Sequence, residues 1–89
     1  MIQYYVRGDS MRLDKYLKVS RLIKRRTVAN EACDAGRVIV NEKPVKASYN
    51  VKEGDVIEIL FGARTVKVKV LKVQETVKKD EASELFEYL

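Results

Sequence analysis

The chain has 89 residues, of which 46% are hydrophobic and 35% charged, so it suits one small globular domain and not a disordered tail. Its single cysteine, Cys33, excludes an internal disulfide and favours a reducing, cytoplasmic setting. No apolar run approaches the ~20 residues that span a membrane, and the first residues lack a signal-peptide pattern. There is no histidine and no glycine-rich phosphate loop. We therefore expect a non-enzymatic protein without a metal or cofactor.

The net charge of +5 is concentrated in one segment. Residues 11–30 carry seven basic residues and a single acid, Asp14, whereas the rest of the chain carries 11 basic and 12 acidic residues. A concentrated basic block indicates a polyanionic partner, although a solvated basic face without a partner has the same composition. The seven basic residues are Arg12, Lys15, Lys18, Arg21, Lys24, Arg25 and Arg26.

Two short amphipathic helices are predicted in the basic segment. Residues 12–19 place Leu13, Tyr16 and Leu17 at helical spacing, with Lys15 and Lys18 on the opposite face. Residues 20–24 form a connection in which Leu22 and Ile23 turn toward the core. The second helix begins at 25–27 and ends at Ala35, before Gly36 in a left-handed conformation. Its predicted apolar stripe, which makes Cys33 a buried hydrophobe, consists of Val28, Ala29, Ala32 and Cys33.

After Gly36 the apolar period changes to two, which predicts strands. We expect strands at 37–40 and 45–48 around a turn at 41–44, with Pro44 suited to an edge. Further strands are expected at 56–60 and 66–73, separated by turns at 51–55 and 61–65. The last strand should expose Lys67 and Lys69 on a solvated face. At the C-terminus a third helix is predicted from the helical spacing of Ala82, Leu85, Phe86 and Leu89.

The basic residues Lys24, Arg25 and Arg26 stand where the second helix begins. Cations are unfavourable at that end of a helix dipole, whereas the unpaired N–H groups there attract phosphate. The pattern therefore indicates an anion site, in which Thr27 either caps the helix or hydrogen-bonds a phosphate oxygen. Arginine also suits bidentate phosphate contacts and stacking on unpaired bases.

RNA is favoured over DNA as the polyanion. In a helix-turn-helix protein, the second helix would enter the major groove with its exposed face. Here that face carries Asn30, Glu31 and Asp34, and its two acids would meet phosphates badly. A DNA-binding regulator nevertheless stays open as an alternative, as does a protein-interaction module whose basic face meets an acidic protein.

Residues 12–59 resemble the S-four RNA-binding domain, a family named after a small-subunit ribosomal protein. The shared pattern is R-L-D-x-x-L, an arginine-rich helix junction, G-x-V-x-V-N and V-x-x-G-D before a strand. The "SRLIKRRT" junction and the compact length are similar to the stand-alone RqcP (YabO) ribosome quality control family. Many relatives have V-N-G where this chain has Asn41-Glu42, so the hairpin turn must form without glycine. We expect it to survive because asparagine tolerates a left-handed conformation.

The resemblance implies an α+β, α-L fold: two N-terminal helices on a small, mostly antiparallel sheet, followed by a C-terminal helix. Residues 11–89 would form this single domain, and residues 1–10 are interpreted as an N-terminal extension from a tag or an upstream start. Asp14 would orient a neighbouring basic side chain, and Arg26 would be a principal ribosomal RNA contact. The complete set of predicted RNA-binding residues is Arg12, Asp14, Lys15, Lys18, Arg21, Lys24, Arg25, Arg26, Thr27, Asn30 and Arg37.

The resemblance also implies partners and a pathway. Members of the family bind stalled large ribosomal subunits that carry peptidyl-tRNA, and they support alanine tailing by an RqcH-like factor. We therefore expect large-subunit ribosomal RNA and peptidyl-tRNA as partners, no membrane, and a monomer off the ribosome. A related heat-shock protein, which recycles large subunits with trapped tRNA, defines an alternative function.

Overall fold

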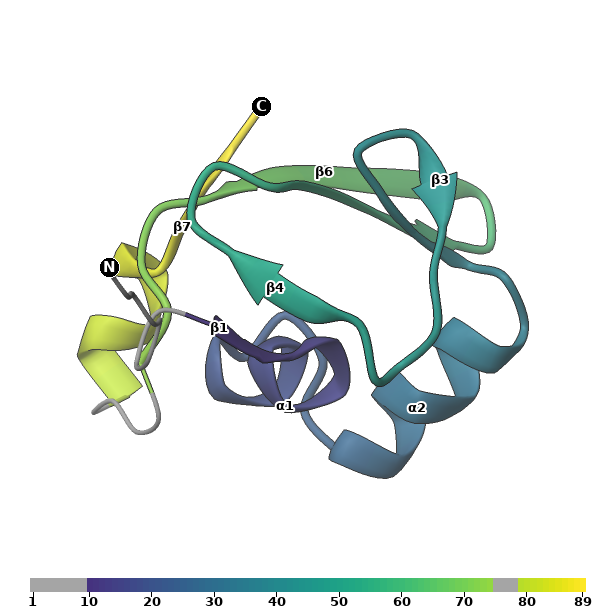
Figure 1. Cartoon of the computed structure of the whole chain (residues 1–89), viewed down its shortest axis with the longest axis horizontal. Helices are drawn as coiled ribbons and strands as arrows, with labels where there is room; N and C mark the ends of the chain where they lie inside the picture. Colours follow the sequence, from purple (N-terminus) through teal and green to yellow (C-terminus); the bar gives the residue numbers. More distant parts are fainter. Residues whose placement is uncertain (1–9, 75–78) are drawn as a thin grey trace, which may run out of the picture.

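Two helices lie on one side of an antiparallel sheet in the computed structural model, which describes residues 10–74 and 79–89 (Figure 1). The helices are α1 (Leu13–Val19) and α2 (Arg26–Asp34). The five-stranded sheet has the order β3-β2-β5-β6-β7, and β1 and β4 form a separate two-stranded sheet. This arrangement confirms the predicted two helices on an antiparallel sheet. The strands are β1 (Ser10–Arg12), β2 (Val38–Val40), β3 (Lys43–Pro44), β4 (Asn50–Lys52), β5 (Val56–Phe61), β6 (Arg64–Val70) and β7 (Phe86–Tyr88).

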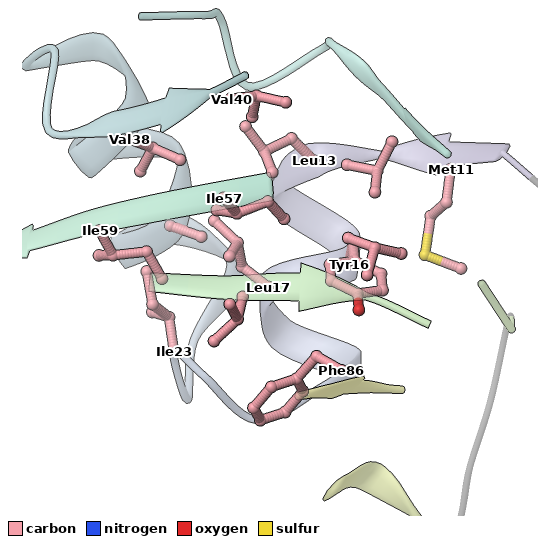
Figure 2. Close-up of a cluster of buried hydrophobic side chains, with 14 of the residues drawn as sticks. Met11, Leu13, Tyr16, Leu17, Ile23, Val38, Val40, Ile57, Ile59 and Phe86 are labelled. Carbon is pink, nitrogen blue, oxygen red and sulfur yellow. The ribbon is translucent and has the colours of Figure 1, made fainter. Parts of the chain in front are cut away.

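The core lies between the helices and the inner face of the sheet. Leu13, Tyr16 and Leu17 of α1 are fully buried, as their spacing predicted, and Figure 2 shows them beside Ile57 and Ile59. These two isoleucines lie on β5, where apolar residues alternate with outward-facing ones. The core therefore fixes α1 against the sheet and determines which of its side chains face solvent.

The predicted apolar stripe of α2 is wrong in one residue. Ala29 and Cys33 are buried and Ala32 is partly buried, but the side chain of Val28 leaves it 46% exposed. Val28 is rotated by about 100° from Ala29 around the helix, which turns it out of the contact with α1. Only a narrow stripe of α2 is therefore covered, and the wider outer face is open to a partner.

The β2–β3 hairpin forms without glycine, as expected. Val40 pairs with Lys43, so the turn consists of Asn41 and Glu42, with φ of 51° and 72°. A two-residue hairpin of this kind requires left-handed geometry at both positions. The strand after this turn is Lys43–Pro44, so the predicted return strand at 45–48 is wrong. The tight turn brings the chain back into pairing at once, and Pro44 lies on the edge strand as predicted.

Strand β1 was not predicted, and β4 occupies part of a predicted turn. Met11 pairs with Val51, and both side chains are buried. The expected turn at 51–55 is shorter than predicted, because only Glu53 and Gly54 lie in the turn. Met11 and Val51 thus extend the core beyond α1. Of the residues interpreted as an N-terminal extension, 1–9 lie outside the described residues.

The predicted C-terminal helix is wrong. Residues Lys79–Glu84 form a 3-10 helix, η1, and Phe86–Tyr88 form β7 at the edge of β6. Ala82, Leu85 and Phe86 are buried as the spacing suggested, but Leu89 is 62% exposed. A single short helix is marginal in water, whereas strand pairing satisfies the otherwise unpaired edge of β6. The segment therefore completes the sheet, and the hydroxyl of Tyr16 secures it by donating to the carbonyl of Leu85 at 2.8 Å.

A buried carboxylate explains why two separated sequence motifs occur together. Asp55 accepts hydrogen bonds from Asn41 Nδ2 at 3.1 Å, Tyr49 Oη at 3.1 Å and the Lys52 amide at 2.9 Å. The amide oxygen of Asn41 in turn accepts from the N–H of Val56 at 3.0 Å. The final asparagine of G-x-V-x-V-N therefore holds the aspartate of V-x-x-G-D. These motif residues connect the β2–β3 turn to the start of β5.

Candidate nucleic-acid interface

The connection between α1 and α2 exposes its basic side chains to solvent because an apolar side chain of the same segment is buried in the core. Ile23 is buried, and its N–H donates to the carbonyl of Leu17 at 3.1 Å. Arg21 has a left-handed backbone with φ of 65°, which ends α1 and reverses the chain. The exposed side chains of this connection and of the start of α2 are Arg21, Lys24, Arg25 and Arg26.

The N-terminus of α2 has the features of an anion site. The N-cap residue is Arg25, its side chain makes no capping hydrogen bond, and the first turn contains no acid. Thr27 lies within that first turn, so the predicted alternative in which it caps the helix is wrong. The first N–H groups of a helix lack partners within the helix and carry partial positive charge. Together with the surrounding arginines, they favour an anionic ligand.

Asp14 organises the side chains around this site from a buried position. It is only 2% exposed and lies in the first turn of α1, facing α2. Arg12 donates from Nε to Oδ1 at 3.3 Å and from Nη2 to Oδ2 at 3.2 Å. Arg26 Nη2 lies 3.3 Å from Oδ1, and Asn30 Nδ2 donates to Oδ2 at 3.3 Å. One carboxylate of α1 therefore holds three side chains, one from the end of β1 and two from α2, in a fixed arrangement.

The ionised form of Asp14 is stabilised in spite of its burial. Burial alone raises the pKa of this carboxyl, but hydrogen bonds from Arg12, Asn30 and Arg26 outweigh that effect and hold the pKa below its ordinary 3.8. The two arginine side chains are 49% and 48% exposed, so each retains N–H donors that face solvent. The cluster thus presents two oriented guanidinium groups to a ligand.

The predicted site residues do not all lie together. Arg12, Arg26 and Asn30 contact Asp14 directly. Thr27 lines a depression together with Asp14, Arg26 and Asn30. Lys15 is partly buried, whereas Lys18 is exposed on α1 next to the connection. Arg37 follows the opposite end of α2, roughly 13 Å along the helix axis from its start. The structure therefore separates Arg37 from the cluster.

A third segment next to α1 was not predicted from the sequence. The Leu13 amide donates to the carbonyl of Tyr49 at 2.7 Å, and the Asp14 amide donates to that of Ala47 at 3.2 Å. These bonds hold the β3–β4 connection against the start of α1. Lys46 and Ser48 are exposed on this connection, on either side of Ala47. Their proximity depends on β1 pairing with β4, which periodicity alone did not reveal.

The described residues give little support to a reactive thiol, a metal site or a membrane-spanning helix. Burial, with smaller contributions from Asp14 and Asp34, raises the pKa of Cys33 to about 11, so the thiol is a buried hydrophobe, as predicted. Among residues 10–74 and 79–89, no three histidine, cysteine or acidic side chains are grouped to hold a metal. No helix in the same part of the chain is long and apolar enough to cross a membrane.

The fold and the interface define a small RNA-binding domain of the S4 class, and a family model of the S4 domain matches residues 11–57. A Halalkalibacterium halodurans protein named RQC P-site tRNA stabilizing factor is 58% identical over 77 residues, covering 86% of this chain and 88% of that protein. A Bacillus subtilis protein of the same name is 51% identical over 79 residues, covering 89% and 92% respectively. The chain belongs to the family of RQC P-site tRNA stabilizing factors.

A solved structure supports the same fold. Heat Shock Protein 15 of Vibrio cholerae, described as trimeric, superposes with a TM-score of 0.84 at 27% sequence identity. The match covers 91% of this chain and 83% of that protein.

Proposed function

We propose that the protein is a non-catalytic RNA-binding factor that binds ribosomal RNA and peptidyl-tRNA on stalled large ribosomal subunits. It would act as a monomer in ribosome-associated quality control and support alanine tailing by an RqcH-like factor. The names of the relatives support the pathway, because they describe factors that stabilise a P-site tRNA. The observation that carries RNA binding is the Asp14 cluster, which orients Arg12 and Arg26 at an uncapped helix N-terminus.

The arrangement favours phosphate for a physical reason. Each guanidinium is planar and can donate two parallel hydrogen bonds to phosphate oxygens. Because Asp14 fixes Arg12 and Arg26 before a ligand arrives, less side-chain entropy is lost on binding. The exposed Lys24 and Arg25 add attraction without fixed geometry. Ribosomal RNA offers such phosphates on a folded surface, which suits an interface spread over two helices and a connection.

Sedimentation with large ribosomal subunits tests this function. Wild type should co-sediment with large subunits through a sucrose gradient, whereas Arg26→Ala should remain mostly at the top. Lys69→Ala is the matched control, because Lys69 is an exposed cation on the sheet, paired across strands with Glu87. Equal co-sedimentation of wild type and Arg26→Ala would show that the junction does not bind the ribosome.

Two further measurements separate the alternatives. Association with large subunits that survives nuclease digestion of the RNA would favour a protein-interaction module, and tighter binding to duplex DNA than to structured RNA would favour a DNA-binding regulator. The fold shared with Heat Shock Protein 15 supports a recycling factor as the second candidate. Loss of alanine tails on stalled nascent chains in a deletion strain distinguishes the tailing role from recycling.

A further inference from the structure

A depression between α1 and α2 adjoins the Asp14 cluster but has the wrong charge for a simple phosphate site. Its volume is about 410 Å³, and it is lined by Asp14, Arg26, Thr27, Asn30 and Glu31. Glu31 is exposed, and its carboxylate has no ion-pair partner within the described parts of the chain. A free carboxylate repels phosphate at close range. This wall of the depression therefore faces a different part of the RNA.

The polar atoms of that wall are hydrogen-bond acceptors. Asn30 donates from Nδ2 to Asp14 Oδ2 at 3.3 Å, and since a carboxylate only accepts, the amide orientation is fixed. Its Oδ1 is therefore free to accept from a ligand. Glu31, the next residue, supplies two more acceptor oxygens. On the other side, the half-exposed guanidinium of Arg26 offers a planar surface on which a base can stack.

We infer that this depression receives an unpaired guanine base of the bound RNA, with Glu31 and Asn30 accepting hydrogen bonds from its Watson–Crick edge. Guanine presents two adjacent donors there, the ring N1–H and the exocyclic amine, which match a carboxylate. Adenine and cytosine each place an acceptor nitrogen beside their amine, and uracil flanks its N–H with two carbonyls. The inference rests on the proposed function, because Arg26 and its neighbours must first hold the adjacent phosphates.

Three RNA hairpins test this assignment. Their loops consist of uridines except for the central base, which is guanine, inosine or adenine. Wild type should bind the guanine hairpin about tenfold more tightly than either of the other two hairpins. Inosine tests the exocyclic amine, because it differs from guanine only in lacking that group. Glu31→Gln replaces an acceptor oxygen with a donor and should abolish this preference. Asp34→Asn removes the same charge from an exposed position outside the depression and should retain it.

The outcomes separate this inference from the proposed function. If wild type shows no preference among the three hairpins, or if Glu31→Gln retains it, the base assignment is wrong. It is also wrong if Glu31→Gln and Asp34→Asn increase the affinity for every hairpin equally, since Glu31 would then act only through its charge. Arg26→Ala should weaken binding to all three hairpins, and equal binding by this variant and wild type would instead contradict the proposed function.

Discussion

Asp14 is an acid in the most basic part of the chain, and its contacts give that position a physical reason. Two arginines and an asparagine donate to its buried carboxylate, so its charge orients cations that would otherwise repel one another. The family resemblance implied that Asp14 orients a neighbouring basic side chain, and the contacts with Arg12 and Arg26 confirm this. The position of the β3–β4 connection against α1 could not be predicted, because it depends on a strand pairing between distant segments.

The lowered pKa of Asp14 predicts how its contribution to stability depends on pH. A carboxyl with a pKa below that of the unfolded chain, about 3.9, stabilises the fold above that pH and loses this effect as pH falls through the folded pKa. The difference in unfolding free energy between wild type and Asp14→Asn should stay constant from about pH 7 to pH 5 and shrink below about pH 4. Urea unfolding at each pH measures it.

The control for this titration is Asp34→Asn, which removes an exposed acid at the last residue of α2. Its difference from wild type should remain small over the whole range of pH. A difference for Asp14→Asn that persists unchanged below about pH 3 would show that the carboxylate charge does not stabilise the cluster.

Glu42 adopts a left-handed backbone, with φ of 72°, that favours glycine. A residue with a Cβ loses roughly 1–2 kcal/mol in that conformation, and part of the gain from glycine is offset by the greater entropy of the unfolded chain. Glu42→Gly should therefore raise the unfolding free energy by about 0.5–1 kcal/mol. Glu42→Gln keeps the strain while removing the charge, and equal stabilisation by both variants in urea would attribute the effect to charge.

At the scale of elements, the sequence predicted both helices and the long strands, but β1 was missed and the C-terminal segment was assigned to a helix. The buried positions Ala82, Leu85 and Phe86 have helical spacing, yet they form a 3-10 helix and a strand. The period of apolar residues identifies which side chains are buried. The backbone conformation of a short segment, however, depends on whether a neighbouring strand has a free edge with which it can pair. β6 offers such an edge to residues 86–88, and the sequence of these residues alone does not show that this edge is available.

The hydroxyl of Tyr16 joins α1 to this C-terminal segment. Tyr16→Phe removes one of three donors to the Leu85 carbonyl, which still accepts from the amides of Leu71 and Lys72. The loss of this one hydrogen bond should lower the unfolding free energy by about 0.5–1.5 kcal/mol. Tyr88→Phe is the matched control, because Tyr88 is 69% exposed, and it should change stability little. Equal stability of the two variants in urea unfolding would show that the hydrogen bond does not hold the segment.

At the scale of the whole molecule, the excess of positive charge is segregated to one stretch of the chain, which forms α1, the connection and the start of α2. The cations of α1, the connection and the start of α2 are concentrated, whereas Lys67 and Lys69 on β6 pair across strands with Glu58 and Glu87. The predicted solvated lysine face of the sheet is consistent with these neighbours. RNA should therefore approach the helices, and the sheet should serve mainly as their support.

This segregation predicts the salt dependence of RNA binding. If about five to seven cations contact phosphate, the logarithm of affinity should fall with the logarithm of salt concentration at a slope of roughly −4 to −6. Arg26→Ala should make the slope shallower by about one unit, and Lys69→Ala should leave it unchanged. Filter binding to purified large-subunit ribosomal RNA measures the three slopes. Equal changes for both variants would indicate diffuse attraction without a defined interface.

The most direct test of the central claim is the affinity of Asp14→Asn for the same ribosomal RNA, measured at fixed salt above about pH 6 after its folding is verified by circular dichroism. Removing an acid strengthens RNA binding if only net charge matters. If Asp14 instead orients Arg12 and Arg26, the variant should bind about fivefold more weakly, with a smaller loss in an Arg26→Ala background. Equal or tighter binding by folded Asp14→Asn would contradict the account.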